Sequence, residues 1–201
     1  MTWRVDSRFA GAGGQGLALA AVVVAEAGLA SGYAVALTQE YGPEARGGAS
    51  RADVVLSDEP IANPQCGIPD ILLALHDKAW HKFARTRPAV MAALAEGRCT
   101  ALVDADLVRV EPGVAGILAL PFEAAARTEL RAKVVANMIG VGAFACVSGR
   151  FSRDAIEEAV AKRSPEAFRP VNRAAVRRGW DMAAAHGSVF DGSLVGHAVS
   201  A

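Results

Sequence analysis

The sequence is poor in cysteine, and its three cysteines are far apart. Cys66, Cys99 and Cys146 form no C-x-x-C pair. A disulfide framework, a zinc ribbon and an iron–sulfur cluster held by this chain alone are therefore disfavoured, because each needs paired or closely spaced thiols. We interpret the three thiols as small buried side chains of a cytoplasmic protein.

The chain also lacks an excess of charge of either sign. Its 21 Lys and Arg residues balance its 21 Asp and Glu residues, and no long basic stripe is present. Binding to nucleic acid or to a membrane surface through bulk charge is therefore disfavoured.

No hydrophobic run is long enough to cross a membrane. The most apolar stretch, residues 134–147, is interrupted by Asn137 and is shorter than the roughly 18 residues that a membrane span needs. The first residues lack a basic patch followed by an apolar signal core. We therefore expect a soluble protein that works away from membranes.

What the sequence does contain is an alternation of strand and helix patterns. Its 201 residues, of which 52% are hydrophobic, are enough for one buried core. The apolar runs predict strands at residues 3–10, 33–38, 52–56, 71–75, 100–103 and 117–120. From residue 122 onward the patterns are helical. The alternation predicts an α/β fold with a Rossmann-like, mostly parallel sheet flanked by helices and a C-terminal helical segment. We assign residues 1–187 to one domain and residues 188–201 to a C-terminal tail.

A glycine-rich turn follows the first predicted strand and opens the first predicted helix. Gly11, Gly13 and Gly16 form a G-x-G-x-x-G pattern, with Gly14 and Gln15 between them. Glycines permit a tight turn and a close approach of the backbone to a ligand, and a helix N-terminus offers free N–H groups to an anion. The pattern predicts a contact with an anion or cofactor. The alternative is a tight strand-to-helix turn that binds nothing.

Glu40 favours a dinucleotide site at this turn. A nucleotide-binding fold of the common type places an acidic residue about 20 positions after the glycines, at the end of the second strand. Glu40 lies close to that place. A free-standing NAD(P)- or flavin-dependent oxidoreductase is therefore an alternative reading, and a regulatory nucleotide-sensing domain is another.

A second unusual segment follows at once. Residues 41–48 read YGPEARGG and combine turn-forming Pro and Gly residues with a charged pair. The Arg46 guanidinium suits a phosphate or carboxylate, and Glu44 could pair with it or meet a partner. The plain alternative is a surface loop with an ion pair worth less than about 1 kcal/mol. Residues alone leave both open.

No catalytic set accompanies these segments. The sequence contains no acidic metal cluster for a thiamine diphosphate magnesium ion and no convincing Ser-His-Asp pattern. We therefore assign no catalytic residue and no metal ligand. Asn137 is expected to be a buried, hydrogen-bonded amide. Arg173, Arg177 and Arg178 are expected to form a solvated helix face.

Together the two segments resemble a known family. GAGGQG at 11–16 followed by EYGPEARGGASRADVVLSDEPI at 40–61 resembles the gamma subunit of the 2-oxoacid:ferredoxin (acceptor) oxidoreductases. The resemblance continues in order through PDILLAL (69–75), LPFEAAA (120–126), KVVANMIGVGAF (133–144) and NRAAVRRGW (172–180).

The resemblance implies a role in a multisubunit enzyme. Alpha and beta subunits hold thiamine diphosphate and magnesium, and a ferredoxin-like subunit carries iron–sulfur clusters. The assembly oxidatively decarboxylates a 2-oxoacid to an acyl-CoA, and the gamma chain contributes to coenzyme A binding and assembly without being catalytic alone. The loop at 41–48 favours the acyl-CoA-forming branch, with 2-oxoglutarate, pyruvate or phenylglyoxylate as substrate.

The resemblance also assigns residues to these tasks. The glycine turn would lie near the phosphate end of coenzyme A, and the second segment would face the catalytic subunits or the coenzyme. The first set is Gly11, Gly13, Gly14, Gln15 and Gly16. The second set is Glu40, Tyr41, Gly42, Pro43, Glu44, Arg46, Gly47 and Gly48.

Overall fold

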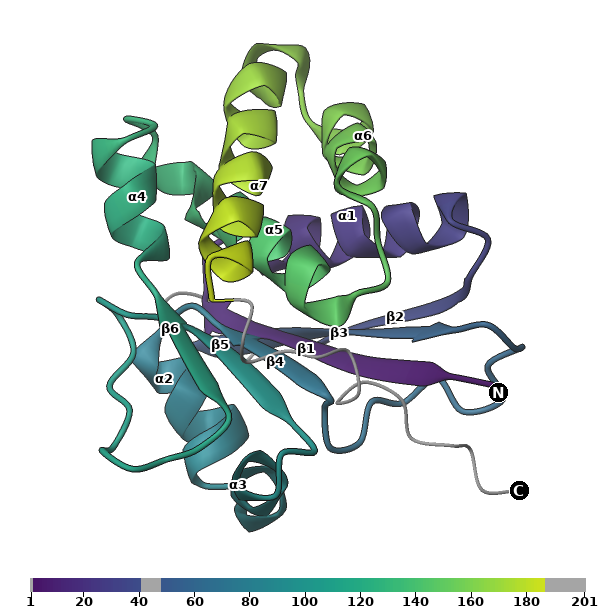
Figure 1. Cartoon of the computed structure of the whole chain (residues 1–201), viewed down its shortest axis with the longest axis vertical. Coiled ribbons are helices and arrows are strands. Elements are labelled where there is room, and N and C mark those ends of the chain that lie inside the picture. The colour runs from purple at the N-terminus through teal and green to yellow at the C-terminus, as the bar shows by residue number, and fades with distance from the viewer. Residues whose placement is uncertain (1, 41–47, 187–201) are drawn as a thin grey trace.

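The computed structural model of the chain describes residues 2–40 and 48–186, and these form a six-stranded sheet between helical layers (Figure 1). The strand order is β2-β3-β1-β4-β5-β6. The strands are β1 (Arg4–Ala12), β2 (Ala34–Glu40), β3 (Ala49–Ser57), β4 (Ile71–Ala74), β5 (Thr100–Asp104) and β6 (Ile117–Leu120). The α/β fold predicted from the sequence is confirmed.

One strand departs from the parallel arrangement. β1, β4, β5 and β6 pair in parallel, whereas β3 is antiparallel to both β1 and β2. The cause is the short connection between β2 and β3, which consists of residues 41–48. A parallel crossover needs about a dozen residues or more, so this connection can only make a hairpin. The sheet is therefore mixed, although every strand except β3 runs in the same direction.

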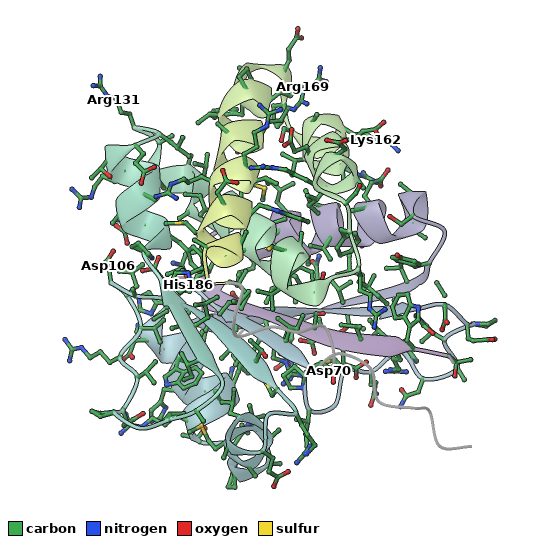
Figure 2. The ribbon with its side chains drawn as sticks, in the orientation of Figure 1. Asp70, Asp106, Arg131, Lys162, Arg169 and His186 are labelled. Carbon is green, nitrogen blue, oxygen red and sulfur yellow. The ribbon has the colours of Figure 1, made fainter. Side chains whose placement is uncertain are left out.

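The helices cover both faces of the sheet. In Figure 1, α1, α4, α5, α6 and α7 lie above it, and α2 and α3 lie below. The helices are α1 (Leu17–Ala30), α2 (Asp77–Trp80), a π-helix η1 (His81–Arg85), α3 (Pro88–Ala95), α4 (Phe122–Thr128), α5 (Ala136–Ser148), α6 (Arg153–Arg163) and α7 (Arg169–Ala184), with short 3-10 turns η2 (Lys133–Val135) and η3 (Glu166–Phe168). Charged side chains such as Arg131 and Lys162 point outward from the upper layer (Figure 2).

The two layers bury separate cores on the two faces of the sheet. Along β4, Ile71 and Leu73 point into the upper core and Leu72 and Ala74 into the lower one. This alternation follows from the two-residue period of a strand. Every residue of β4 and β5 is buried, as expected for parallel strands covered on both faces. Among the described residues, no helix is long and apolar enough to cross a membrane.

Glycines let α5 approach its neighbours closely. A Cβ at Gly140 would lie 2.9 Å from the Leu73 side chain of β4. A Cβ at Gly179 of α7 would lie 1.8 Å from the Ile139 carbonyl oxygen, and one at Gly142 of α5 would lie 2.0 Å from the Val176 carbonyl oxygen. Glycine at these positions therefore sets the position of α5 over the carboxyl end of the sheet.

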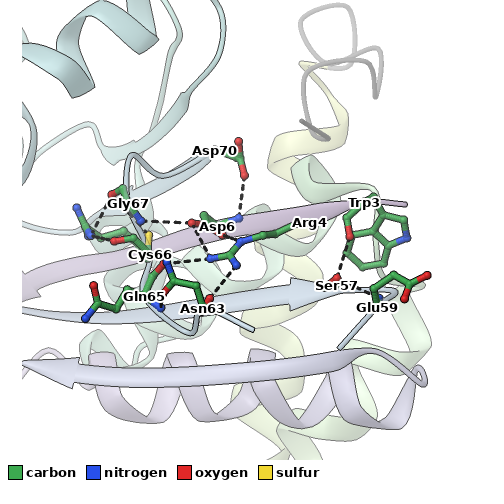
Figure 3. Close-up of polar contacts among 11 residues, drawn as sticks. Trp3, Arg4, Asp6, Ser57, Glu59, Asn63, Gln65, Cys66, Gly67 and Asp70 are labelled. Carbon is green, nitrogen blue, oxygen red and sulfur yellow. Dashed lines mark hydrogen bonds and ion pairs between the residues drawn. The ribbon is translucent and has the colours of Figure 1, made fainter. Parts of the chain in front are cut away.

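The chain between β3 and β4 contacts the first residues of β1, where Arg4 and Asp6 hold it (Figure 3). Arg4 donates to the carbonyl oxygens of Asn63 and Gln65 at 2.8 and 3.0 Å. The Asp6 carboxylate accepts from Arg4 at 2.7 Å and from the Gly67 N–H at 3.3 Å. Side chains from the sheet thereby form hydrogen bonds with the backbone of a segment that has no helix or strand.

Candidate functional site

The glycine turn lies at the carboxyl end of β1. The strand ends at Ala12 and α1 begins at Leu17, so the turn consists of residues 13–16. Gly14 has φ +91° and Gly16 has φ +70°. Only glycine adopts this left-handed region without a steric penalty, which explains these two residues. The strand–turn–helix context that the motif requires is present.

Gln15 links the turn to β4, the neighbouring strand in the sheet. Its Oε1 accepts from the Ala12 N–H at 2.7 Å, and its Nε2 donates to the Leu75 carbonyl oxygen at 2.9 Å. A Cβ at Gly11 would lie 2.6 Å from the same Oε1. The Gln15 amide thus joins the ends of β1 and β4, and Gly11 leaves the space in which it sits.

Asn137 of α5 holds the other side of the turn. Its Nδ2 donates to the Gly16 carbonyl oxygen at 3.0 Å, and its Oδ1 accepts from the Met138 N–H at 2.9 Å. The residue is 5% exposed. The prediction of a buried, hydrogen-bonded amide is confirmed; that its partner is the glycine turn could not be read from the sequence.

A cleft of about 360 Å³ opens beside the turn, within the range of small-molecule sites. It lies at the carboxyl ends of β1, β4 and β5, where α/β folds bind their ligands. Its lining includes Gly14, Gln15, Leu75, Asp104, Glu123 and Asn137. The cleft thus joins the predicted glycine turn to residues far along the chain.

Two helix N-termini meet at this cleft. Gly14 and Gln15 precede α1, while Ala136 and Asn137 begin α5, and all four line the cleft. Neither helix has an acidic residue in its first turn or a side-chain cap from its N-cap residue. The first N–H groups of α1 have no partner within that helix, whereas at the start of α5 the Ala136 N–H donates to the Lys133 carbonyl oxygen and the Met138 N–H donates to Asn137 Oδ1. Both helix N-termini carry partial positive charge. The cleft therefore suits an anionic group.

The acidic residues of the cleft are already engaged. The Asp104 carboxylate accepts from the N–H groups of Asp106, Leu107 and Glu123 at 2.9, 3.2 and 2.8 Å. Burial raises the pKa of Asp104, and these three donors oppose the rise. Asp106 is labelled in Figure 2, in the turn after β5. Asp104 was missed from the sequence, although an acid at the carboxyl end of a predicted strand was a usable signal.

A cation stands at the edge of the same cleft. Lys133, whose side chain is 72% exposed, pairs with Glu123 at 2.6 Å. Lys133 lies in the segment that carries the family resemblance but was not selected as a site residue. The Glu123 side chain is only 16% exposed, so the pair keeps the ammonium group at the rim of the cleft.

The two segments singled out in the sequence meet in space. The Gly13 N–H donates to the Gly48 carbonyl oxygen at 3.1 Å. Gly48 is the last residue of the loop segment, so that segment ends beside the glycine turn. The remaining predicted site residues, Tyr41, Gly42, Pro43, Glu44, Arg46 and Gly47, lie outside the described residues.

Glu40 is placed differently from the acid of a common dinucleotide fold. It ends β2 and pairs with Arg51 of β3 at 2.8 Å, directly across the hairpin. In that fold the acidic residue lies on the strand next to the glycine strand. Here β3 separates β2 from β1. The geometry therefore gives no support to Glu40 as a ribose ligand.

A smaller, apolar cleft of about 250 Å³ adjoins the first. The two share Gly14, Val134 and Asn137, and Leu19 and Phe168 line the smaller one. Val134 is 70% exposed and Phe168 is 49% exposed. The glycine turn is therefore bordered by apolar surface as well as by free N–H groups.

The predicted arginine face is exposed to solvent, and its side chains also form ion pairs between helices. Arg173 and Arg177 bind the Glu157 carboxylate at 3.3 and 2.7 Å, and Glu157 is 4% exposed. Arg178 pairs with Glu129 at 2.6 Å. These guanidinium groups are half-exposed, but they join α7 to α6 and α4. Sequence spacing shows which residues share a helix face. It does not show which acidic residue of another helix the fold places beside them.

The protein's membership of a family rests on both sequence and fold. The chain matches the pyruvate ferredoxin/flavodoxin oxidoreductase family over residues 6–182. It is 38% identical to the 2-oxoglutarate synthase subunit KorC of Archaeoglobus fulgidus over 182 residues, which cover 90% of this chain and 89% of that subunit.

Two solved structures share the fold. The gamma subunit of a keto/oxoacid ferredoxin oxidoreductase from Geobacter sulfurreducens has a TM-score of 0.75 and 40% identity, covering 90% of this chain and 99% of that chain. A 2-oxoglutarate:ferredoxin oxidoreductase from Magnetococcus marinus, solved with 2-oxoglutarate, coenzyme A and succinyl-CoA bound, has a TM-score of 0.76. It is 19% identical and covers 91% of this chain and 31% of that chain, so this likeness shows the fold alone.

The matched region contains the features from which the resemblance was inferred. Residues 6–182 include the glycine turn, the segment 41–48 and the helix that carries Asn137. Among the described residues, no group of three or more His, Cys, Asp or Glu side chains is arranged to hold a metal ion. The resemblance to the gamma chains is confirmed: this protein belongs to the pyruvate ferredoxin/flavodoxin oxidoreductase family.

Proposed function

We propose that this chain is the gamma subunit of a thiamine-diphosphate-dependent 2-oxoacid oxidoreductase that forms acyl-CoA, and that it binds part of coenzyme A. The observation that carries the proposal is the cleft at the carboxyl edge of the sheet. There a glycine turn and two helix N-termini without acidic residues face one space, in a chain of this family.

The residues fit the phosphate end of coenzyme A. Backbone N–H groups at the start of α1 favour a dianion by direct hydrogen bonds, and the dipoles of α1 and α5 both favour negative charge at this place. Lys133 adds a cation at the rim, and Gly14 leaves open space because nothing lies within 4 Å of its Cβ position. The apolar cleft beside it suits the uncharged arm of the coenzyme. In this assignment the chain binds and orients the acyl acceptor.

The chemistry itself belongs to other chains in this proposal. Thiamine diphosphate, magnesium and iron–sulfur clusters are placed in the alpha, beta and ferredoxin-like subunits, and this chain is not catalytic alone. The segment 41–48 is assigned to contacts with those subunits, and the bond from Gly13 to Gly48 would link such contacts to the coenzyme cleft. A relative named 2-oxoglutarate synthase favours 2-oxoglutarate as the acid. Three unpaired thiols suit a reducing compartment, so we place the assembly in the cytoplasm.

A matched pair of glycine substitutions tests this function. Gly14→Val puts an isopropyl group into the cleft at φ +91°, and Gly113→Val imposes the same backbone strain at φ +86° in an open loop away from it. In the assembled complex, Gly14→Val should weaken coenzyme A binding at least about tenfold, as measured by titration calorimetry. The two substitutions cost similar backbone energy, but only Gly14→Val places its side chain in the cleft. Gly113→Val should leave it unchanged.

Two outcomes would overturn the proposal. One is oxidation of a 2-oxoacid by this chain alone. The other is tight binding of NAD(P) or flavin that Gly14→Val abolishes while coenzyme A binding stays intact. The free-standing oxidoreductase would then be correct; at present the relatives named as subunits give it no support.

A further inference from the structure

The Asn137 side chain of α5 contacts the glycine turn at the edge of the cleft. It is 5% exposed, and both ends of its amide are used. Nδ2 donates across the fold to the Gly16 carbonyl oxygen at 3.0 Å, whereas Oδ1 accepts from the adjacent Met138 N–H at 2.9 Å. The second bond orients the amide, so that its donor faces Gly16.

The Gly16 carbonyl oxygen receives two donors. The Ala20 N–H of α1 donates to it at 3.0 Å, and Asn137 supplies the second bond. Gly16 is the N-cap of α1 and has φ +70°. A bond from a separate helix therefore fixes the residue that sets the direction of the first free N–H groups of α1. A Cβ at Gly16 would lie 2.5 Å from the Asn137 Nδ2, so the contact also requires glycine.

The position of Asn137 depends on the packing of α5. Gly140 lies three residues later, where a Cβ would be 2.9 Å from the Leu73 side chain. Residues three apart lie on the same helix face. The face of α5 that rests closely on β4 is therefore the face that presents Asn137 to the turn. The close packing of Gly140 on Leu73 therefore helps to set how far the Asn137 amide lies from the Gly16 carbonyl oxygen.

We propose that Asn137 is a positioning residue for the coenzyme cleft: it acts through Gly16 and holds the N-terminus of α1 in the orientation that receives an anion. The identity of that anion as a phosphate of coenzyme A rests on the proposed function. The positioning itself does not, because it concerns contacts within this chain.

Asn137→Ala and Asn137→Asp separate positioning from general stability. Asn137→Ala removes the donor, whereas Asn137→Asp keeps the shape and the bond to Met138 but turns an acceptor toward the Gly16 carbonyl. Ser148→Ala is the matched control, because it removes a buried hydrogen-bonding group of the same helix at the end away from the cleft.

The first readout is hydrogen–deuterium exchange of the assembled complex in the peptide that contains Ala20. Both Asn137 variants should speed its exchange about tenfold, as loss of one hydrogen bond implies. Ser148→Ala should not. If neither Asn137 variant speeds exchange more than Ser148→Ala does, the positioning role is wrong, whatever the ligand.

The second readout is steady-state kinetics of the same complex. Both Asn137 variants should raise the KM for coenzyme A about tenfold and leave kcat and the KM for the 2-oxoacid within about twofold. Asn137→Asp should be the worse, because its charge also repels an anion. An equal fall in kcat with all three variants, or no change in KM, would refute the inference. Faster exchange in a complex whose wild type does not bind coenzyme A would refute the proposed function and leave the positioning role supported.

Discussion

The crossing of α5 and α7 provides a sharp test of the packing. Gly179→Ala adds one methyl group where the Cβ position is 1.8 Å from the Ile139 carbonyl oxygen and 3.0 Å from the Ala143 nitrogen. Both are backbone atoms, so no side chain can turn away to make room. The helices must separate instead.

Two effects oppose each other in this variant. Replacing glycine by alanine in a helix normally stabilises by about 0.5–1 kcal/mol. Relief of the clash requires the helices to move apart, and a gap of about 100 Å³ between them costs about 2.4 kcal/mol at about 24 cal/mol per Å³. Off-rotamer neighbours add about 1 kcal/mol. The cost of the clash is larger than the gain in helix propensity, and the net loss of unfolding free energy is about 2.5 kcal/mol.

The measurement is thermal unfolding followed by circular dichroism. For a chain of this size a loss of about 2.5 kcal/mol lowers the Tm by about 5–10 °C. Gly67→Ala is the control, because nothing lies within 4 Å of its Cβ position and its φ is ordinary. It should change the Tm by no more than about 2 °C. A Gly179→Ala protein that melts with the wild type would show that α5 and α7 do not approach this closely.

Three further outcomes are expected. The Asp53 carboxylate binds the buried Arg8 guanidinium through two hydrogen bonds of 2.8 and 2.9 Å, and Asp53→Asn removes this charged partner. The variant should lose about 3–5 kcal/mol of unfolding free energy in a urea titration. A loss below about 1 kcal/mol would contradict the burial of the pair. The Arg177 guanidinium lowers the pKa of Glu157 below its ordinary value of 4.5, so this stabilisation is present above that pH and is lost as pH falls through the lower folded value. Glu157→Gln should therefore reduce the Tm at pH 7 and flatten its decline in acid; an unaltered pH profile would exclude the linkage. Burial raises the pKa of Cys66 and Cys99 to about 12. Both thiols should therefore be alkylated about a thousandfold more slowly at pH 8 than a free thiol. Rapid alkylation, detected by mass spectrometry, would contradict this expectation.

Much of the fold could be predicted from periodicity. The helix at Leu17–Ala30 and the strand at Ile117–Leu120 have the predicted bounds, because uninterrupted apolar patterns end at glycine or proline. The hairpin strands were predicted too short: Ala34–Glu40 and Ala49–Ser57 extend toward the loop through polar residues. An exposed strand end carries no hydrophobic signal, and for the same reason the antiparallel direction of β3 was missed.

The candidate site could be predicted only where its residues are adjacent in sequence. The glycine turn was recognised from its spacing; of its two left-handed residues, Gly16 belongs to the G-x-G-x-x-G pattern and Gly14 lies between its glycines. Asp104, Lys133 and Asn137 come from segments about 90–120 positions away from the turn and carry no joint pattern with it along the chain. The Arg8–Asp53 pair was missed for a similar reason, since a charged residue in a strand is ordinarily expected to face water.

By itself the sequence determined most of the secondary structure, the α/β class, the glycine turn and, through its motifs, the family, because each of these is read from local patterns and from their order along the chain. Only the tertiary structure decided the reversed strand β3, the junction of Gly13 with Gly48, the two helix N-termini at one cleft and the amide that fixes Gly16. The physical reason is that strand order and helix packing bring distant residues together, and a hydrogen bond or a cleft depends on distances of a few ångströms that no local pattern encodes.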